Sequence, residues 1–302
     1  DLKSKIILIS GPTASGKSEF AVKIAKKING EIINADSMQV YKQLKILTAR
    51  PTKKNQKKIK HHLYGFQNVA KKFSTGAWLK LAIKKIKEVR KKNKVPILVG
   101  GTGLYFKVLT DGLVKIPNIP LKIRNETRSM QKKIGQDSFY EKLIKLDPLA
   151  SNKIDSNDVH RSIRAYEIKK YTKISMYKWF KKTKQFFNKD IFLKFYIDFG
   201  REKLIKRINS RVEKMIKNGA VKEVERFNKL KIMKENSANK VIGIQEISKY
   251  LNGQIDLLET KKQIIIKTRQ YAKRQTTWAR GQMMNWQKIE PQNLTSALKI
   301  FK

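Results

Sequence analysis

The stretch IILISGPTASGKS, residues 6–18, decides the fold. Its apolar start predicts a buried strand, and the turn that follows contains Gly11, Gly16, Lys17 and Ser18 with the spacing G-x-x-x-x-G-K-[ST] of a phosphate-binding loop. In such a loop backbone N–H groups surround phosphate oxygens, the next helix dipole favours negative charge, the lysine neutralises it, and the serine hydroxyl can hold Mg²⁺. The motif therefore predicts a phosphorylated ligand, without saying which one or whether it is hydrolysed.

The length and charge of the chain limit what surrounds this loop. The chain has 302 residues, 40% of them hydrophobic, which suffices for one large domain or for a core with an inserted domain. Lysine and arginine number 69 against 24 aspartates and glutamates, a formal net charge of +45. This excess predicts a polyanionic partner, nucleic acid first, although a general bias toward Lys, Ile and Asn also raises the charge everywhere.

Other compositional features exclude classes of chemistry. The absence of cysteine excludes disulfides and thiolate catalysis, and the three histidines lack the spacing of a zinc site. No apolar run has the length of a signal-peptide core or of a membrane span. We therefore expect a cytoplasmic protein that has no membrane anchor.

Polar residues also follow other predicted strands. Residues 31–35 form a short strand with Asp36 at its carboxyl end, and residues 95–99 form a buried strand that ends in the glycine turn 100–103, GGTG. Because the carboxyl ends of parallel strands meet at one edge of a sheet, both features should lie near the phosphate loop. Asp36 is a candidate base or Mg²⁺ ligand, and it also suits the N-cap of a helix over residues 37–42.

Amphipathic helices and one more strand complete the core pattern. Helices are predicted over residues 19–28 and 78–89, a strand over 193–197, and a further helix from about residue 202. That last helix carries arginines, including Arg207 and Arg211.

A long helix over residues 261–280 is the second most informative stretch. Its apolar face repeats every seven residues, while Arg269, Lys273 and Arg280 form a basic face. Basic helical faces of this kind bind nucleic-acid backbones.

Residues 116–191 differ from the rest, because their pattern is helical and poor in strands. A helix capped by one of residues 155–158 would carry His160, Arg161 and Arg164 on one arc. Such a face suits phosphate contact, although solvated arginines follow the same pattern. We expect this segment to be an inserted helical domain.

Two basic segments have simpler interpretations. The lysine-rich run at residues 53–60 is expected to be a solvated loop that can also touch phosphate. His61 and His62 are adjacent, so their side chains diverge in any regular structure, which argues against a shared metal. Surface positions are the expectation for both histidines.

Six motifs occur in order along the chain: GPTASGKS (11–18), ADSMQVY (35–41), TARP (48–51), GGTGLY (100–105), DVHRSIRAYEI (158–168) and TRQYAKRQTTWAR (268–280). Together they resemble the tRNA dimethylallyltransferases, the isopentenyl transferases that modify adenosine 37 beside the anticodon. The resemblance covers nearly the whole chain. It implies an α/β fold with a P-loop nucleoside-triphosphate-hydrolase-like core, in which helices flank a parallel sheet. Residues 1–115 and 192–302 would form this core, and the all-helical insertion at 116–191 would grip the tRNA anticodon stem-loop.

The resemblance also implies a reaction. A dimethylallyl group would pass from dimethylallyl diphosphate to N6 of adenosine 37 in tRNAs that read U-initial codons. Asp36 would take the N6 proton as general base, while Lys17, the loop N–H groups and Mg²⁺ held by Ser18 would stabilise the leaving diphosphate. Thr102 matches a position near the reacting centre, so the catalytic residues would be Asp36, Lys17, Ser18 and Thr102. The target base must be flipped out of its stack to be reached.

The same resemblance implies binding residues for both substrates. The diphosphate would contact the whole phosphate loop, Gly11, Pro12, Thr13, Ala14, Ser15, Gly16, Lys17 and Ser18. The tRNA would contact Asp36, Ser37, Met38, Gln39, Thr102, Arg124, His160, Arg161, Arg164, Lys273, Arg274, Gln275, Thr276, Thr277, Trp278 and Arg280. No obligate protein partner is implied, and a monomer is expected.

The chain departs from the family pattern at two places. Where the family has Gly-Tyr followed by Arg or Lys, this chain has Gly243, Ile244 and Gln245, so an aromatic and a cationic tRNA contact are missing. His160 also replaces the commoner glutamine.

Two other functions remain open at this point. A P-loop nucleotide or RNA kinase would use the same loop with Asp36 on Mg²⁺, but a small-metabolite kinase does not need the Thr102 turn and two arginine-bearing helices. A non-catalytic RNA-binding protein would not need the intact loop together with Asp36.

Overall fold

The computed structural model describes residues 2–52, 56 and 59–301. The chain forms two compact units, one made of Asp1–Thr110 with Phe187–Lys302 and the other of Asp111–Phe186. Of the lysine-rich run at 53–60, only residues 56, 59 and 60 lie within the described part.

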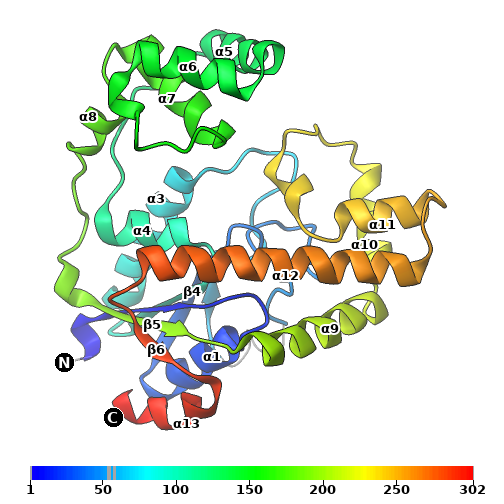
Figure 1. Cartoon of the computed structure of the whole chain (residues 1–302). Coiled ribbons are helices and arrows are strands. Elements are labelled where there is room, and N and C mark those ends of the chain that lie inside the picture. Colours follow the sequence, from blue (N-terminus) through cyan, green and yellow to red (C-terminus); the bar gives the residue numbers. More distant parts are fainter. Residues whose placement is uncertain (1, 53–55, 57–58, 302) are drawn as a thin grey trace. The chain divides into compact units, whose positions relative to one another are not determined.

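A parallel sheet of six strands forms the centre of the first unit, in the order β3-β2-β4-β1-β5-β6 (Figure 1). The strands are β1 (Ile6–Ser10), β2 (Gly30–Asn34), β3 (His61–His62), β4 (Val95–Gly100), β5 (Phe192–Ile197) and β6 (Gln287–Ile289). The four strands predicted from apolar runs are confirmed as β1, β2, β4 and β5, each within one residue at either end. The two edge strands were not predicted because they are only two and three residues long.

Helices cover both faces of this sheet, which confirms the predicted α/β fold. Those outside the inserted segment are α1 (Lys17–Lys27), α3 (Thr75–Lys91), α4 (Gly103–Asp111), α9 (Arg201–Lys217), α10 (Ala220–Lys229), α11 (Ile244–Leu251), α12 (Leu257–Gln282) and α13 (Leu294–Ala297). Short 3₁₀ helices are η1 (Leu2–Ser4), η2 (Pro148–Ala150), η3 (Lys189–Ile191), η4 (Ser237–Lys240), η5 (Pro291–Asn293) and η6 (Leu298–Phe301). Among the described residues, no helix combines the length and the apolar character that crossing a membrane requires.

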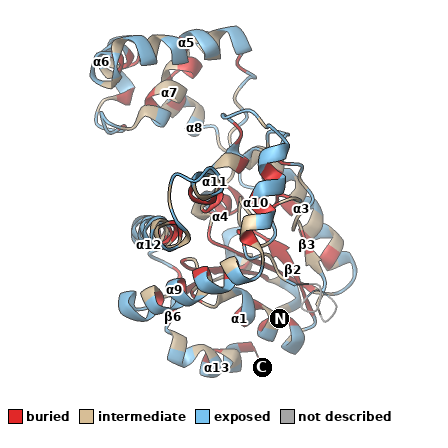
Figure 2. Cartoon of the chain, turned by 90° about the vertical axis from the view of Figure 1, so that its right-hand side faces the viewer, coloured by how far each residue is buried: buried red, intermediate tan, exposed pale blue. Residues whose placement is uncertain are grey.

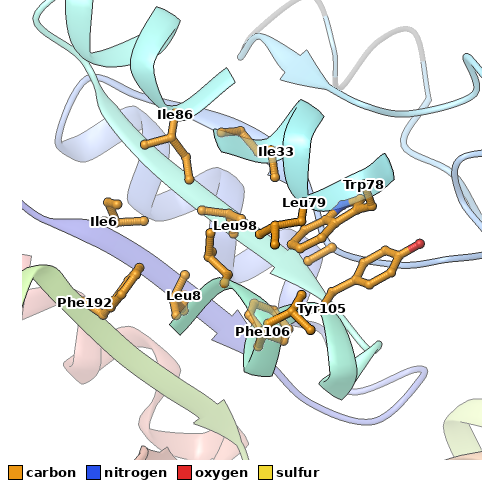
Figure 3. Packing of buried hydrophobic residues seen from close by; sticks show 14 of the residues in the cluster. Ile6, Leu8, Ile33, Trp78, Leu79, Ile86, Leu98, Tyr105, Phe106 and Phe192 are labelled. Carbon is orange, nitrogen blue, oxygen red and sulfur yellow. The ribbon is translucent and has the colours of Figure 1, made fainter. Parts of the chain in front are cut away.

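Strand β1 is buried on both faces, as its unbroken apolar run requires in a parallel sheet. Ile6 and Leu8 join a cluster with side chains of α3 and α4 (Figure 3). Ile7 and Ile9 pack on the opposite face with α1 and the C-terminal segment. The turn after β1 is thus held between two packed layers.

The helix expected over residues 37–42 is absent, and this prediction is wrong. The backbone of the segment pairs with Gln67 instead: the N–H of Gln67 donates to the carbonyl of Val40, and the N–H of Lys42 donates to the carbonyl of Gln67. These bonds take donors and acceptors that a helix would need. A tertiary contact has overridden a local capping signal.

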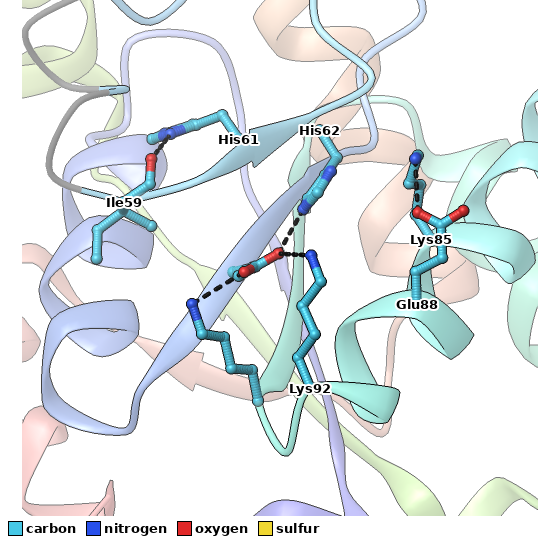
Figure 4. Close-up of polar contacts among 8 residues, drawn as sticks. Ile59, His61, His62, Lys85, Glu88 and Lys92 are labelled. Carbon is cyan, nitrogen blue, oxygen red and sulfur yellow. Dashed lines mark hydrogen bonds and ion pairs between the residues drawn. The ribbon is translucent and has the colours of Figure 1, made fainter.

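The surface position expected for His62 is also wrong, because its side chain is buried in β3. Its Nε2 lies 2.7 Å from Oε2 of Glu31, a buried carboxylate on β2 that also accepts a bond from Lys94 at 3.0 Å (Figure 4). Burial raises the pKa of Glu31, but the bonds with His62 and Lys94 outweigh it and leave the pKa below its usual value. Burial lowers the pKa of His62, against the opposing effect of Glu31.

The second unit consists of the four helices α5 (Leu121–Ile134), α6 (Gln136–Leu146), α7 (Val159–Thr172) and α8 (Met176–Phe180). Its own small core includes Ile119, Leu143, Ala165, Ile168 and Met176. No strand occurs within the described residues of this unit, which spans 111–186 where we expected an insertion at 116–191.

Candidate active site

The phosphate loop joins β1 to α1 in a conformation suited to an anion. Gly16 occupies the N-cap position of α1 with a left-handed φ of 89°, and Ala14 is also left-handed at 64°. Backbone turns of this kind direct successive N–H groups toward a common centre. The buried hydroxyl of Ser15 has no hydrogen-bond partner among the described residues, so the loop also holds an unused polar group.

Lys17 begins α1 and lies in a partly desolvated place. Its Nζ donates to the carbonyl of Pro12 at 3.2 Å. Burial lowers the pKa of Lys17 to about 8, the charge of Asp36 opposes this shift, and the charge of Arg211 adds to it. The loop lysine therefore shares its surroundings with one acid and one further cation.

Two arginines of α9 hold the phosphate loop from the side. Arg211 Nη1 donates to the hydroxyl of Thr13 at 3.1 Å, and Arg207 Nε donates to the carbonyl of Ala14 at 2.7 Å. The sequence alone places both arginines on a predicted helix but does not predict this role. A signal was present, because four-residue spacing puts them on one helix face and their helix follows a strand that pairs with β1.

The carboxylate of Asp36, after β2, is held at one oxygen. Oδ1 accepts the backbone N–H groups of Met38 at 2.9 Å and Gln39 at 3.3 Å. Within the described residues Oδ2 makes no hydrogen bond. Thr102 lies alongside, where its Oγ1 accepts the N–H of Ser37 at 2.9 Å.

Three tyrosines lie near this carboxylate, of which Tyr105 is buried and Tyr64 and Tyr271 are partly buried. Burial first, and then the negative charge of Asp36, raise the pKa of Tyr64, Tyr105 and Tyr271. Tyr105 also stacks on Trp78, with ring centroids 4.1 Å apart. The acid thus lies close enough to these three rings for its charge to act on each phenol.

Helix α12 presents two different faces at this site (Figure 2). Lys273, Arg274, Thr277 and Arg280 are exposed, as a surface for RNA would require. Gln275 instead reaches between the phosphate loop and the second glycine turn. Thr276 and Trp278 are also partly buried, and the Trp278 ring would clash with a side chain at position 103, since an added Cβ would lie 2.2 Å from it.

A cavity of about 1200 Å³ opens beside the phosphate loop. Glu223 is its one acidic residue among those described, and its carboxylate already accepts the N–H groups of Lys45, Ile46 and Leu47 at 2.8 to 3.0 Å. The cavity therefore favours an anionic ligand. Its cationic lining residues are Lys42, Lys45, Arg50, Arg207, Arg211, Lys214 and Arg226.

The site residues expected in the inserted segment lie on α5 and α7. Asp158 caps α7 by accepting the N–H of Arg161 at 3.0 Å, which confirms the predicted helix start. His160 and Arg161 are exposed, whereas Arg164 lies 3.5 Å from the buried carboxylate of Glu167. Arg124 lies on α5 with a buried Nε that has no hydrogen-bond partner in the described part of the chain.

The departure from the family pattern lies at the start of α11. Ile244 is buried in a core cluster, so its side chain packs inside the protein where the family pattern has an aromatic tRNA contact. Gln245 is exposed, and its Oε1 accepts a bond from Lys267 Nζ at 3.3 Å. A cation from α12 therefore lies beside the neutral amide.

Metal ligands are sparse at this site. The described residues contain no group of three His, Cys, Asp or Glu side chains that could hold an ion. Ser18 is exposed in the first turn of α1, where a hydroxyl can complete the shell of a cation that a diphosphate carries. These residues fit a Mg²⁺ ion that is bound mainly by the substrate, rather than one bound by several protein side chains.

Sequence comparison relates the chain to a known family. The family model described as IPP transferase matches residues 39–282. The tRNA dimethylallyltransferase of Pelagibacter ubique is 65% identical over 302 residues, which covers 100% of this chain and 96% of that protein. The enzyme of the same name from Rickettsia massiliae is 43% identical over an alignment that includes 94% of this chain and 78% of that protein.

Solved structures with the same architecture were also found. The Bacillus halodurans tRNA isopentenylpyrophosphate transferase has a TM-score of 0.70 at 31% identity, with 98% of this chain and 95% of that chain covered. A eukaryotic dimethylallyltransferase studied acting on tRNA has a TM-score of 0.81 at 28% identity, with 95% and 73% covered. The chain belongs to the IPP transferase family.

Proposed function

We propose that the protein transfers the dimethylallyl group of dimethylallyl diphosphate to N6 of adenosine 37 in tRNAs that read U-initial codons, forming N6-isopentenyladenosine. The observation that carries this proposal is the carboxylate of Asp36, which is fixed at one oxygen and lies near the lysine of a phosphate-binding loop. An amine that attacks an allylic diphosphate needs these two groups together.

The diphosphate binds at the loop, with its charge matched by Lys17, Arg211 and the N–H groups at the start of α1. Arg211 already contacts Thr13, so little movement is needed to engage a phosphate oxygen. The Ser18 hydroxyl would be among the ligands of Mg²⁺, and the ion would supply further neutralisation of the leaving group.

In the chemical step the N6 lone pair attacks C1 of the dimethylallyl group while the C1–O bond breaks. The electrons of that bond leave with the diphosphate, and the N6 proton passes to Oδ2 of Asp36. The bonds that Met38 and Gln39 donate to Oδ1 orient the carboxylate, and the Thr102 hydroxyl fixes the next residue of the same turn.

The tRNA is held by basic surfaces on both units. The exposed face of α12 binds backbone phosphates near the active site, and His160, Arg161 and Arg164 of the inserted unit, with Arg124, grip the anticodon stem-loop. The flipped adenosine then enters toward Asp36.

The direct test is incubation with labelled dimethylallyl diphosphate and a tRNA that reads U-initial codons. We expect label on adenosine 37 and release of diphosphate, and no label on the same tRNA with guanosine at that position. A kinase would instead form ADP from ATP in step with phosphorylated product, and that outcome without prenylated tRNA would contradict the proposal.

A further inference from the structure

We propose that Gln275 is a positioning residue that locks the phosphate loop to the second glycine turn. The inference rests on the proposed function and extends it. The resemblance implies that Gln275 contacts the tRNA, whereas this proposal gives it a role in diphosphate binding. The side chain comes from α12, yet its amide lies inside the active site.

Both ends of the amide are used, in opposite senses. Oε1 accepts the backbone N–H of Thr13 at 2.8 Å, and Nε2 donates to the carbonyl of Gly101 at 3.0 Å. A glutamine amide accepts through its oxygen and donates through its nitrogen, so its one terminus serves both partners. Two turns that follow neighbouring strands, β1 and β4, are thereby joined through one side chain.

The second glycine turn is shaped around this amide. A Cβ added at Gly101 would lie 2.1 Å from Nε2 and 3.4 Å from Cδ of Gln275. The next nearest atom is the carbonyl oxygen of Gly11, at an ordinary 3.6 Å. Glycine is therefore needed at position 101 because of Gln275 and not because of the surrounding backbone.

The lock acts on the diphosphate side of the reaction. The bond to Thr13 fixes the loop just before its left-handed residues, so the N–H groups of the loop are set before the ligand arrives. The same threonine also accepts the bond from Arg211. The exposed face of α12 can meet RNA without passing through this amide.

A double-mutant cycle tests the proposal in the full-length protein. Gln275→Ala should weaken binding of inorganic pyrophosphate about tenfold and raise the KM for dimethylallyl diphosphate, with the tRNA dissociation constant unchanged. Gly101→Ala should have a similar effect, because its methyl group displaces the amide. In the Gln275→Ala background, Gly101→Ala should weaken pyrophosphate binding by less than about a further twofold, because the amide that the new methyl group would meet is no longer there.

Controls separate this role from general damage. Gln270→Ala, an exposed change on the same helix, and Gly281→Ala, where an added Cβ meets nothing within 4 Å, should leave pyrophosphate binding unchanged. Gln275→Met keeps the volume of the side chain without its polar atoms, so it should match Gln275→Ala in pyrophosphate affinity while melting close to wild type.

Three outcomes would overturn the lock. One is weakened tRNA binding with intact pyrophosphate binding in Gln275→Ala, which would make the residue a direct RNA contact. Another is that Gly101→Ala weakens pyrophosphate binding as much in the double variant as it does alone. The third is normal pyrophosphate affinity in Gln275→Met. Wild-type protein that binds no pyrophosphate would instead overturn the proposed function itself.

Discussion

The hydroxyl of Thr102 lies between two groups of Ser37: it accepts the backbone N–H at 2.9 Å and donates to the side-chain oxygen at 3.2 Å. The glycine turn after β4 is thereby fastened to the residue that follows Asp36. Since Gln275 joins that turn to the phosphate loop, three loops from three adjacent strands are linked by side chains. Changes at single residues of this network should therefore have separable effects.

Asp36→Asn should lower the single-turnover rate of prenyl transfer by about 10²–10⁴, because it removes the base. The amide oxygen can still accept the N–H groups of Met38 and Gln39, so the turn should persist and both substrates should bind nearly as well. Rapid-quench measurements with saturating tRNA check the rate. Asp36→Ala, which also loses the bonds from Met38 and Gln39, is the comparison, and an Asn variant that keeps more than about a tenth of the rate would show that Asp36 is not the base.

The pKa of Lys17, lowered to about 8, predicts a pH dependence of diphosphate affinity. Lys17 carries its charge below this pH and loses it as the pH rises through 8, so pyrophosphate binding should weaken on the alkaline side. Lys17→Arg stays charged there and should show no such loss.

Calorimetric titrations of both forms at pH values on either side of 8 test this. The ionisation of pyrophosphate itself affects both forms equally, so the informative quantity is the difference between their curves. Parallel curves would mean that Lys17 does not contact the anion.

Arg280→Glu should weaken tRNA binding and flatten its salt dependence, since each lost phosphate contact lowers the log–log slope by about 0.7–0.9. The matched control is Lys87→Glu on α3, an equal change of charge at an exposed position outside the proposed RNA surface. Filter binding over a range of salt concentrations gives both slopes. Equal losses in both variants would show that affinity follows net charge alone.

Gln245→Arg should tighten tRNA binding by about 1 kcal/mol at low salt and steepen the salt slope by one contact. The side chain is exposed, so the arginine would add a positive charge at the surface, whereas the neighbouring Lys267 is already ion-paired with Glu246. The single-turnover rate at saturating tRNA should not change, because equal binding of ground and transition states leaves the chemical step alone. An unaltered slope would place Gln245 away from the RNA.

The buried pair of Glu31 and His62 predicts a loss of stability in acid. The folded-state pKa of His62 lies below its usual 6.5, so the unfolded chain binds more protons as the pH falls through that value. Glu31, whose pKa lies below 4.5, contributes in the same direction at lower pH. His62→Gln should reduce the loss near pH 6.5 and leave the part due to His61, whose pKa burial also lowers, whereas the exposed His160→Gln should keep all of it; thermal melts across this range decide between them.

Sequence patterns were sufficient where burial or backbone geometry leaves few choices. The run at 6–9 is apolar on both faces and so was predictable as a central strand, and the glycine spacing after it marked the loop. The roles of Arg207, Arg211 and Gln275 depend on which strands become neighbours, and that is set by packing across the whole sheet. His62 was misplaced because its partner, Glu31, lies on another strand and makes an inward histidine stable.

The two faces of α12 make its length a constraint. Asp256 caps the helix by accepting the N–H of Glu259 at 2.7 Å, and this fixes where the helix begins. The number of residues after the cap then sets the direction in which each later side chain points. One residue inserted between this cap and Gln275 would turn the amide by about 100° and expose it, while a solvent-facing side chain would meet the phosphate loop. Insertions and deletions in this part of α12 should therefore be more damaging than substitutions on its outer face that keep the positive charge.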